Sequence, residues 1–268
     1  MSDGLVVLGD DALVVAVSSR HGARLSSLVV GGRERLVTRR GDPLGWGAFP
    51  MVPFAGRLRD AVLAFEGSTH RFPAHTDGHA IHGTVLDETW RTVSHDHTSA
   101  EFEVDLGEPW PFGGSVTHAI DVDGAAGVVR CRLAVCAGDQ SMPAQVGWHP
   151  WFDGYDSLQI DFATVLARDA RGIPDGTVGV EPAAGTRDDC FTGARTWPVV
   201  WWADGWSIRV ESSCSHWVVY DVPRDACCVE PQSGAPNDVN ARPAVLQPGD
   251  SLVHDMVLRL IPPVIGNT

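Results

Sequence analysis

The chain of 268 residues contains no lysine, and all 20 of its basic residues are arginines. Without lysine it cannot form a Schiff base with a carbonyl substrate, anchor pyridoxal phosphate or build a P-loop phosphate site. No G-x-G-x-x-G motif follows an expected strand, so nothing indicates a dinucleotide site. We therefore expect chemistry that uses no cofactor.

Long apolar runs and basic clusters are also missing. No stretch is long and apolar enough to span a membrane, and the N-terminus Met1–Gly4 has no basic region followed by an apolar core. The net charge is −14, from 20 basic and 34 acidic residues. An acidic chain without a basic run argues against nucleic acid and anionic lipid as partners. We expect a cytoplasmic protein that binds neither, as a monomer or weak homodimer.

The six cysteines never occur as C-x-x-C. Cys131 and Cys136 lie in apolar runs, which is typical of small buried side chains. In a cytoplasmic chain this pattern predicts neither a disulfide framework nor a zinc site.

Short apolar or alternating runs recur along the whole chain and are separated by Gly, Pro or Asp. Two of them flank Gly31-Gly32, which predicts a hairpin with a two-residue turn. No window keeps a helical stripe for three turns without a breaker. The pattern predicts an all-β sandwich or barrel, and without repeats or linkers we expect a single domain, residues 1–268. The main expected strands are 5–8, 13–17, 28–30, 33–37, 61–65, 100–104, 116–122, 128–133, 158–162, 207–210, 217–220 and 252–258.

One carboxylate stands out, because Glu230 follows the apolar run Ala226–Val229 and precedes Pro231. Pro231 has no amide hydrogen for a sheet ladder, so we expect the strand to end there and a loop to begin. A carboxyl group partly buried at that point would have a raised pKa suited to proton transfer near neutral pH. The alternative is an acid at the sheet edge facing water.

Two histidines have unusual surroundings. His149 lies between Trp148 and the pair Pro150-Trp151, which predicts an imidazole held in an apolar wall at a strand end and able to donate a proton. His82, between Ile81 and Gly83, is expected to be partly buried and oriented. His75 and His79 precede it, but the segment lacks the H-E-x-x-H pattern, so we expect no metal.

A cationic group and aromatic rings complete the candidate set. Arg57 follows Gly56, which leaves room for a ligand, and a guanidinium can contact two neighbouring hydroxyl groups. Trp148 and Trp151 could stack on a sugar face, with the sandwich core as the alternative place for each. Together these residues provide an acid, a base and a hydroxyl clamp, with no nucleophile, metal or cofactor.

In this order the motifs resemble the aldose 1-epimerase (galactose mutarotase) family over roughly residues 45–240. The motifs that carry the resemblance are Pro53–Leu58, Ile81–Val85 with Trp90, Gly147–Phe152, Asp188–Phe191 and Glu230–Asn237. The resemblance implies a β-supersandwich of the galactose mutarotase-like type.

The resemblance also implies roles for individual residues. Glu230 matches the catalytic base, His149 the catalytic acid and His82 a second active-site histidine that binds the sugar. Arg57 and Asp188 match positions that bind hydroxyl groups, although Asp189 is adjacent to Asp188 and either could contact the sugar.

The implied reaction interconverts the α and β anomers of a free aldose such as glucose or galactose. The chain departs from many members of the family in having Gly56 before Arg57, where Asn is common, and Trp151, where Tyr is common. Three alternatives remain at this point. They are a hexose-6-phosphate epimerase, a non-catalytic sugar-binding domain of the same fold, and a glycoside hydrolase using Asp188 with Glu230.

Overall fold

A computed structural model describes residues 4–10, 12–39, 41–75, 77–179 and 186–263. In this part of the chain the secondary structure is almost entirely β, with one four-residue α-helix and one short 3-10 helix. The elements are β1 (Leu5–Asp10), β2 (Leu13–Ser18), β3 (Arg24–Val30), β4 (Arg33–Glu34), β5 (Ala48–Met51), β6 (Arg57–Leu58), η1 (Arg59–Ala61), β7 (Val62–Phe65), β8 (Ser68–Arg71), β9 (Ala80–Ile81), β10 (Arg91–His95), β11 (Ser99–Asp105), β12 (Ser115–Asp123), β13 (Val128–Cys136), β14 (Met142–Ala144), β15 (Gly147–Asp153), β16 (Ser157–Arg168), β17 (Pro174–Gly179), β18 (Asp188–Trp201), β19 (Ser207–Ser212), β20 (His216–Tyr220), β21 (Ala226–Gln232), α1 (Asp238–Ala241), β22 (Ala244–Leu246) and β23 (Ser251–Ile261).

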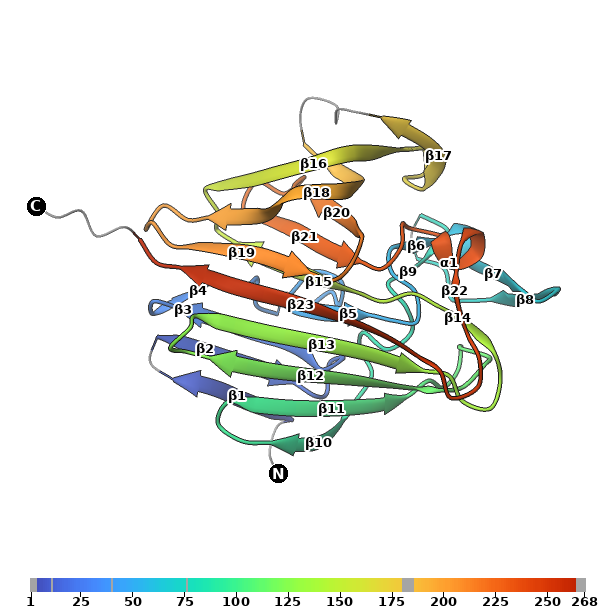
Figure 1. Ribbon diagram of the computed structural model, residues 1–268, viewed down its shortest axis with the longest axis horizontal. Coiled ribbons are helices and arrows are strands. Elements are labelled where there is room, and N and C mark those ends of the chain that lie inside the picture. Colours follow the sequence, from blue (N-terminus) through green and yellow to red (C-terminus); the bar gives the residue numbers. More distant parts are fainter. Residues whose placement is uncertain (1–3, 11, 40, 76, 180–185, 264–268) are drawn as a thin grey trace, which may run out of the picture.

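The strands form two antiparallel layers that share the long strand β18. One layer runs β10–β11–β12–β13–β23–β19–β18, and β16 and β17 extend it beyond β18. The other runs β18–β20–β21–β15–β5–β3–β2–β1. Figure 1 shows β11, β12, β13 and β23 in front, with β1, β2, β3, β5 and β15 behind them. Continuous pairing through β18 makes this a β-supersandwich.

The main core lies between these layers. Strands β2, β12 and β13 alternate buried and less buried residues, as expected for strands with one face on a core. The fully buried Val15, Ile120, Leu133 and Leu258 belong to one hydrophobic cluster drawn from both layers. Burial of such side chains stabilises the sandwich by ~1.5–3 kcal/mol each.

Each expected strand overlaps an observed one, and most ends agree within a few residues, but β16 continues past 162 to Arg168 and β3 begins before 28, at Arg24. The hairpin turn at Gly31-Gly32 is also confirmed, and both glycines have positive φ. All six cysteines are unpaired, and five of them, all but Cys136, are buried. Among the described residues, no helix has the length and apolar character required to cross a membrane.

Two strand ends were predicted wrongly, at Pro150 and Pro231. β15 continues through Pro150 to Asp153, and β21 continues through Pro231 to Gln232. The two strands pair at Gly147 with Gln232 and at Trp151 with Cys228, and the pairing is interrupted between these points. Both prolines lie in that interruption, and each lacks the amide hydrogen that would have bonded to the other strand, while β15 stays paired with β5 and β21 with β20. The sheet therefore accommodates each proline without ending the strand.

Candidate active site

The predicted acid and base are neighbours across two strands. The register that pairs Gly147 with Gln232 and Trp151 with Cys228 places His149 opposite Glu230. The His149 Nε2 and Glu230 Oε1 atoms are 3.2 Å apart, and both side chains are buried. Because the two residues are opposite each other in the interrupted part of the ladder, the backbone itself sets their approach.

Aromatic rings hold His149 on both sides. Its imidazole stacks on Phe49, at 4.8 Å between centroids, and on Trp151, at 5.3 Å. Phe49 is opposite His149 on β5, and Trp151 is two residues along β15, so all three side chains share one face of the sheet. Burial lowers the pKa of His149 to about 3, with a smaller contribution from Arg24. Burial therefore disfavours the imidazolium form of His149.

The pKa of Glu230 is shifted in the opposite direction, upwards. Burial raises the pKa of Glu230 well above its ordinary value, and the nearby charge of Asp188 raises it further. A hydrogen bond donated by Gln232 Nε2 to Glu230 Oε2, at 3.2 Å, and the positive charge of Arg57 lower it. Burial thus favours a neutral carboxyl group and a neutral imidazole side by side.

His82 contacts His149 from the loop that follows β9. It has a φ of 58°, a left-handed conformation that non-glycine residues seldom adopt. Its ring meets that of His149 edge-on at 4.8 Å, and burial holds the pKa of His82 well below the usual value. Such backbone strain is concentrated at functional sites.

The cationic clamp comes from Arg57 on β6. Its Nε donates to Asp77 Oδ2 at 3.0 Å, and its guanidinium lies 3.6 Å from Asp188 Oδ2. Asp188 also accepts from Arg168 at 2.8 Å, while Asp189 pairs with the Arg168 Nε at 3.1 Å. Asp188 lines the cavity described next and Asp189 does not, because consecutive residues on β18 point to opposite faces.

These groups enclose a cavity of about 190 Å³. This is smaller than the ~300–1,000 Å³ of sites for drug-sized ligands, and its size suits one small molecule. The residues that line it are Leu44, Gly56, Arg57, Ile81, His82, His149, Trp151, Asp188, Val218, Tyr220, Glu230, Gln232 and Pro236.

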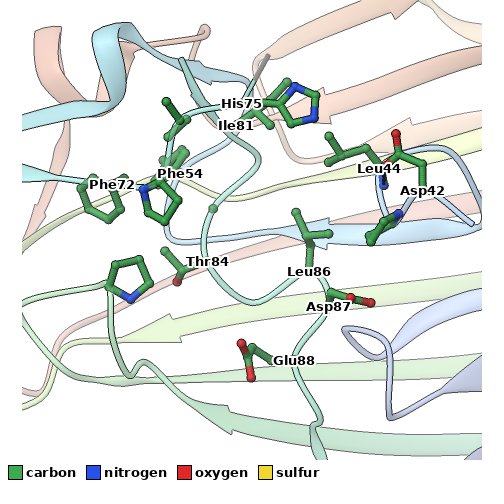
Figure 2. A pocket seen from close by; sticks show the side chains of 16 residues that line it. Asp42, Leu44, Phe54, Phe72, His75, Ile81, Thr84, Leu86, Asp87 and Glu88 are labelled. Carbon is green, nitrogen blue, oxygen red and sulfur yellow. Dashed lines mark hydrogen bonds between the residues drawn. The ribbon is translucent and has the colours of Figure 1, made fainter. Parts of the chain in front are cut away.

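A larger cavity of about 420 Å³ lies next to it and shares Leu44 and Ile81 with it. Figure 2 shows Phe54, Phe72 and Thr84 on one side of that cavity and Leu44 and Asp42 on the other. Its walls are mainly apolar, with Asp87 and Glu88 along one loop, and the His149–Glu230 pair lines the smaller cavity and not this one. The smaller cavity is therefore the candidate active site.

The structure brings six of the seven predicted site residues to this cavity. They are Arg57, His82, His149, Trp151, Asp188 and Glu230. Trp148 is the exception. It points into the core between the layers, is fully buried, and donates its Nε1 hydrogen to His118 Nε2 at 3.2 Å. Trp148 and His149 are adjacent on a strand, so their side chains lie on opposite faces. The prediction of a sugar contact for Trp148 is therefore corrected.

Sequence reasoning missed Phe49, Tyr220 and Gln232. Phe49 stacks on His149, Tyr220 meets the Trp151 ring edge-on at 5.7 Å, and Gln232 contacts Glu230. Gln232 could have been predicted from the sequence, because it is two residues after Glu230 and lies on the same face if the strand continues. Phe49 and Tyr220 depend on which strands lie side by side, and no local signal gives this.

Gly56, one of the two departures from the resemblance, is explained by Pro236. Gly56 has a φ of +68°, and a Cβ at this position would lie 2.8 Å from Pro236 Cγ and 3.1 Å from Pro236 Cα. Asn tolerates the left-handed backbone better than most residues, but its Cβ would still collide with this proline. Pro236 lies in the loop after β21 and lines the cavity, so a larger residue at position 56 would displace part of the cavity wall.

We expect Gly56→Asn to lower the free energy of unfolding by ~1–3 kcal/mol, the usual cost of overpacking. Gly32→Asn is the matched control, because Gly32 has a φ of +74° and nothing lies within 4 Å of its added Cβ. Denaturant unfolding of both variants measures the difference. Equal stability of the two variants would contradict the steric explanation.

The donor atoms of His82, His149 and Glu230 all lie within 4.8 Å of one another, so a metal ion could be considered. Imidazoles that hold a resident metal almost always donate their second ring N–H to a protein group. Here the Nδ1 atoms of both histidines are buried, and no hydrogen-bond partner is found among the described residues. The set therefore fits a resident metal poorly and an acid–base pair well.

Comparison with known proteins agrees with the fold. A Caenorhabditis elegans structure described as a GalM/aldose epimerase homologue has a TM-score of 0.84 at 15% identity, covering 97% of this chain and 99% of that one. A galactose mutarotase-like protein of Clostridium acetobutylicum has a TM-score of 0.83 at 15% identity, covering 96% and 95%. The galactose 1-epimerase of Lactobacillus acidophilus NCFM has a TM-score of 0.77 at 18% identity, covering 97% and 94%.

Sequence comparison gives the family. The uncharacterized Escherichia coli K12 protein YphB is 26% identical over 246 residues, covering 79% of this chain and 83% of that protein. The model of the aldose 1-epimerase family matches residues 4–259, which is almost the whole chain. The chain therefore belongs to the aldose 1-epimerase family.

Proposed function

We propose that the protein is an aldose 1-epimerase that interconverts the α and β anomers of a free aldose. The observation that carries the proposal is the His149–Glu230 pair, an acid and a base 3.2 Å apart in a cavity of monosaccharide size. A protein that only binds sugar has no need of such a pair. A glycoside hydrolase would have to use Asp188 with Glu230, and Asp188 is engaged by two arginines.

The proposed reaction opens and recloses the sugar ring. Glu230 takes the proton of the anomeric hydroxyl, whose O–H electrons form the new carbonyl bond. The C1–O5 bond breaks, its electrons pass to O5, and O5 takes a proton from His149. The C1–C2 bond then rotates by about half a turn, and the reverse transfers close the ring on the other face. Each positioned proton transfer typically contributes ~10²–10⁴-fold to the rate.

The protonation states of His149 and Glu230 fit this cycle. The reactive form has a charged Glu230 and a charged His149, and ring opening converts both residues to their neutral forms. Burial favours the neutral pair in the empty site. One proton transfer across the 3.2 Å contact interconverts the two forms without exchange with solvent. The enzyme can therefore prepare its reactive state when the sugar hydroxyl groups enter and solvate the charges.

The charges around the cavity support an uncharged sugar as substrate. The arginines in and beside the cavity are each paired with an aspartate. Arg57 pairs with Asp77 at 3.0 Å, Arg59 with Asp169 at 2.8 Å, Arg168 with Asp188 at 2.8 Å, and Arg171 with Asp60 at 2.6 Å. A phosphate group would need a cation that these aspartates do not already neutralise. We therefore favour a free aldose over a hexose 6-phosphate.

The direct test follows anomer exchange in freshly dissolved α-D-glucose and α-D-galactose, by polarimetry and by NMR. Buffer is kept dilute because buffers catalyse the reaction themselves. We expect acceleration well above background with at least one free sugar and much less with glucose 6-phosphate. Acceleration of the phosphosugar alone would replace the substrate assignment. No acceleration of any of the three would leave sugar binding without turnover.

We expect an excess of EDTA to leave the epimerase rate unchanged, because the proposed steps use only side-chain proton transfers. Rates before and after chelation, with metal content measured in both samples, test this. Loss of the rate on chelation and recovery with one added divalent ion would show that a metal takes part.

A further inference from the structure

Gln232 is the buried neighbour of the proposed base. It lies two residues after Glu230 on β21. Both residues are buried, with exposed fractions of 0% for Gln232 and 2% for Glu230. The strand that faces it carries Gly147, where an added Cβ would lie 3.2 Å from Gln232 Cα and 2.6 Å from Pro231 O. The backbones therefore approach too closely for any side chain at position 147, and Gln232 has no competing side chain opposite it there.

The two oxygens of Glu230 have separate partners. Oε1 faces His149 Nε2 at 3.2 Å, and Oε2 accepts from Gln232 Nε2 at 3.2 Å. His149 leaves its position as a donor when it gives its proton to the sugar, whereas the Gln232 amide cannot transfer a proton. One of the two contacts on the carboxylate therefore persists through the whole cycle.

The oxygen end of the Gln232 amide is the part available to a ligand. Gln232 lines the cavity, and its Oε1 is buried with no hydrogen-bond partner among the described residues. A buried acceptor in a cavity normally has a partner, and a sugar hydroxyl would supply one. The amide is thus held by Glu230 at one end and, at the other, has an unpartnered oxygen on a residue of the cavity wall.

We propose that Gln232 is the positioning residue of this enzyme: its amide hydrogen bond orients Glu230 and favours the ionised form that takes the proton. This inference rests on the proposed function. It assigns to Gln232 a role that acts through Glu230, not a proton transfer of its own. The amide offsets part of the effect of burial, which otherwise favours the protonated carboxyl group.

Other charged or titratable groups also surround Glu230, and they remain unchanged when Gln232 is replaced. They are His149 on β15, Asp188 and Cys190 on β18, Arg57 on β6, His82 after β9, Tyr220 on β20 and Cys228 on β21 itself. A change in the titration of Glu230 on replacement of Gln232 can therefore be attributed to the amide.

The test replaces Gln232 with Met, which keeps the length and approximate shape but donates no hydrogen bond. The reactive form and the neutral pair hold the same single proton, so loss of that proton from Glu230 sets the alkaline limb of the kcat/KM profile. Loss of the hydrogen bond raises the pKa of Glu230, so this alkaline limb should move to higher pH. Hydrogen bonds to charged groups typically correspond to a shift of about one to two pH units. Activity below the limb should fall about tenfold or more, because less of the pair is ionised, and it should approach wild-type activity above the limb. Gln232→Glu, which adds a second carboxyl group, should move the limb further.

Gln145→Met is the matched control. Gln145 is also a buried glutamine, but its Nε2 donates to the Gly234 and Ala235 carbonyl oxygens and not to a carboxylate. A purely structural role of Gln232 would lower activity equally at all pH values, as this control can. An unchanged limb in Gln232→Met would overturn the inference, whatever the change in KM.

A second measurement does not depend on turnover. Carbon-13 NMR of labelled Glu side chains, with the Glu230 signal assigned by its absence in Glu230→Gln, reports the pKa of Glu230 in wild type and in Gln232→Met. A higher pKa in the variant supports the inference, and equal values overturn it. If wild type proves inactive on every sugar, the proposed function fails while this titration still decides the role of Gln232.

Discussion

Glu230→Gln should lower kcat by ~10²–10⁴-fold, because the amide has the shape of the carboxylate but cannot accept the proton of the anomeric hydroxyl. KM should change little, since Arg57, His82, Asp188 and Trp151 still line the cavity. Polarimetry or NMR anomer exchange measures the rate. Glu101→Gln on β11, in the other layer, is the control and should keep wild-type activity. Full activity of Glu230→Gln would contradict the mechanism.

The same variant should change the pH dependence of stability in a defined direction. The folded-state pKa of Glu230 is raised above its ordinary value of 4.5 by burial. Its contribution to stability is therefore complete below that value and is lost as pH rises through the folded-state pKa. Glu230→Gln has no such group, so it should be more stable than wild type at alkaline pH. The same shift predicts that wild-type activity should fall towards alkaline pH, as the pair loses its single proton through the raised pKa of Glu230.

His149→Asn should also lower kcat by ~10²–10⁴-fold, because O5 would leave without a proton donor. The double variant with Glu230→Gln should be little slower than either single variant, since an acid and a base that act as a unit are strongly non-additive. Anomer exchange rates of the four proteins give the comparison. Independent, multiplicative losses would show that the two residues do not act in one step.

Chemical rescue sharpens this prediction. His149→Ala leaves a slot between the rings of Phe49 and Trp151, which stack on the imidazole in the native protein. Added imidazole should restore part of the lost rate in that variant. Imidazole also catalyses the reaction in solution, so His149→Ala combined with Glu230→Gln provides the background. Equal imidazole effects on the two proteins would argue against His149 as the acid.

Much of the fold could be predicted because strand signals are local. Alternation and β-branched runs mark β12, β13 and β23, and Gly31-Gly32 marks a hairpin. The pairing of β18 with strands of both layers depends on contacts between distant segments. No single stretch of sequence contains that information.

Six of the seven predicted site residues line one cavity, and the seventh was misplaced because proline was read as the end of a strand. With β15 ending near Pro150, the alternation rule could not be applied across it, and Trp148 and Trp151 received the same role. In the continuous strand they are three residues apart and so lie on opposite faces. The same rule, continued through Pro231, places Gln232 beside Glu230. Each strand continues past its proline because it remains paired with its other neighbour, β5 or β20.

The interruption between β15 and β21 has a consequence for how durable the site is. Pro150 and Pro231 have no amide hydrogens. The hydrogen bonds that they would donate between the two strands beside His149 and Glu230 therefore cannot form, whatever the side chains do. Both strands are interior members of the sheet, flanked by β5 and β20. The distance between the proposed acid and base is therefore set by the backbone of the sheet. It does not depend on a mobile loop, and it persists until the sheet itself unfolds.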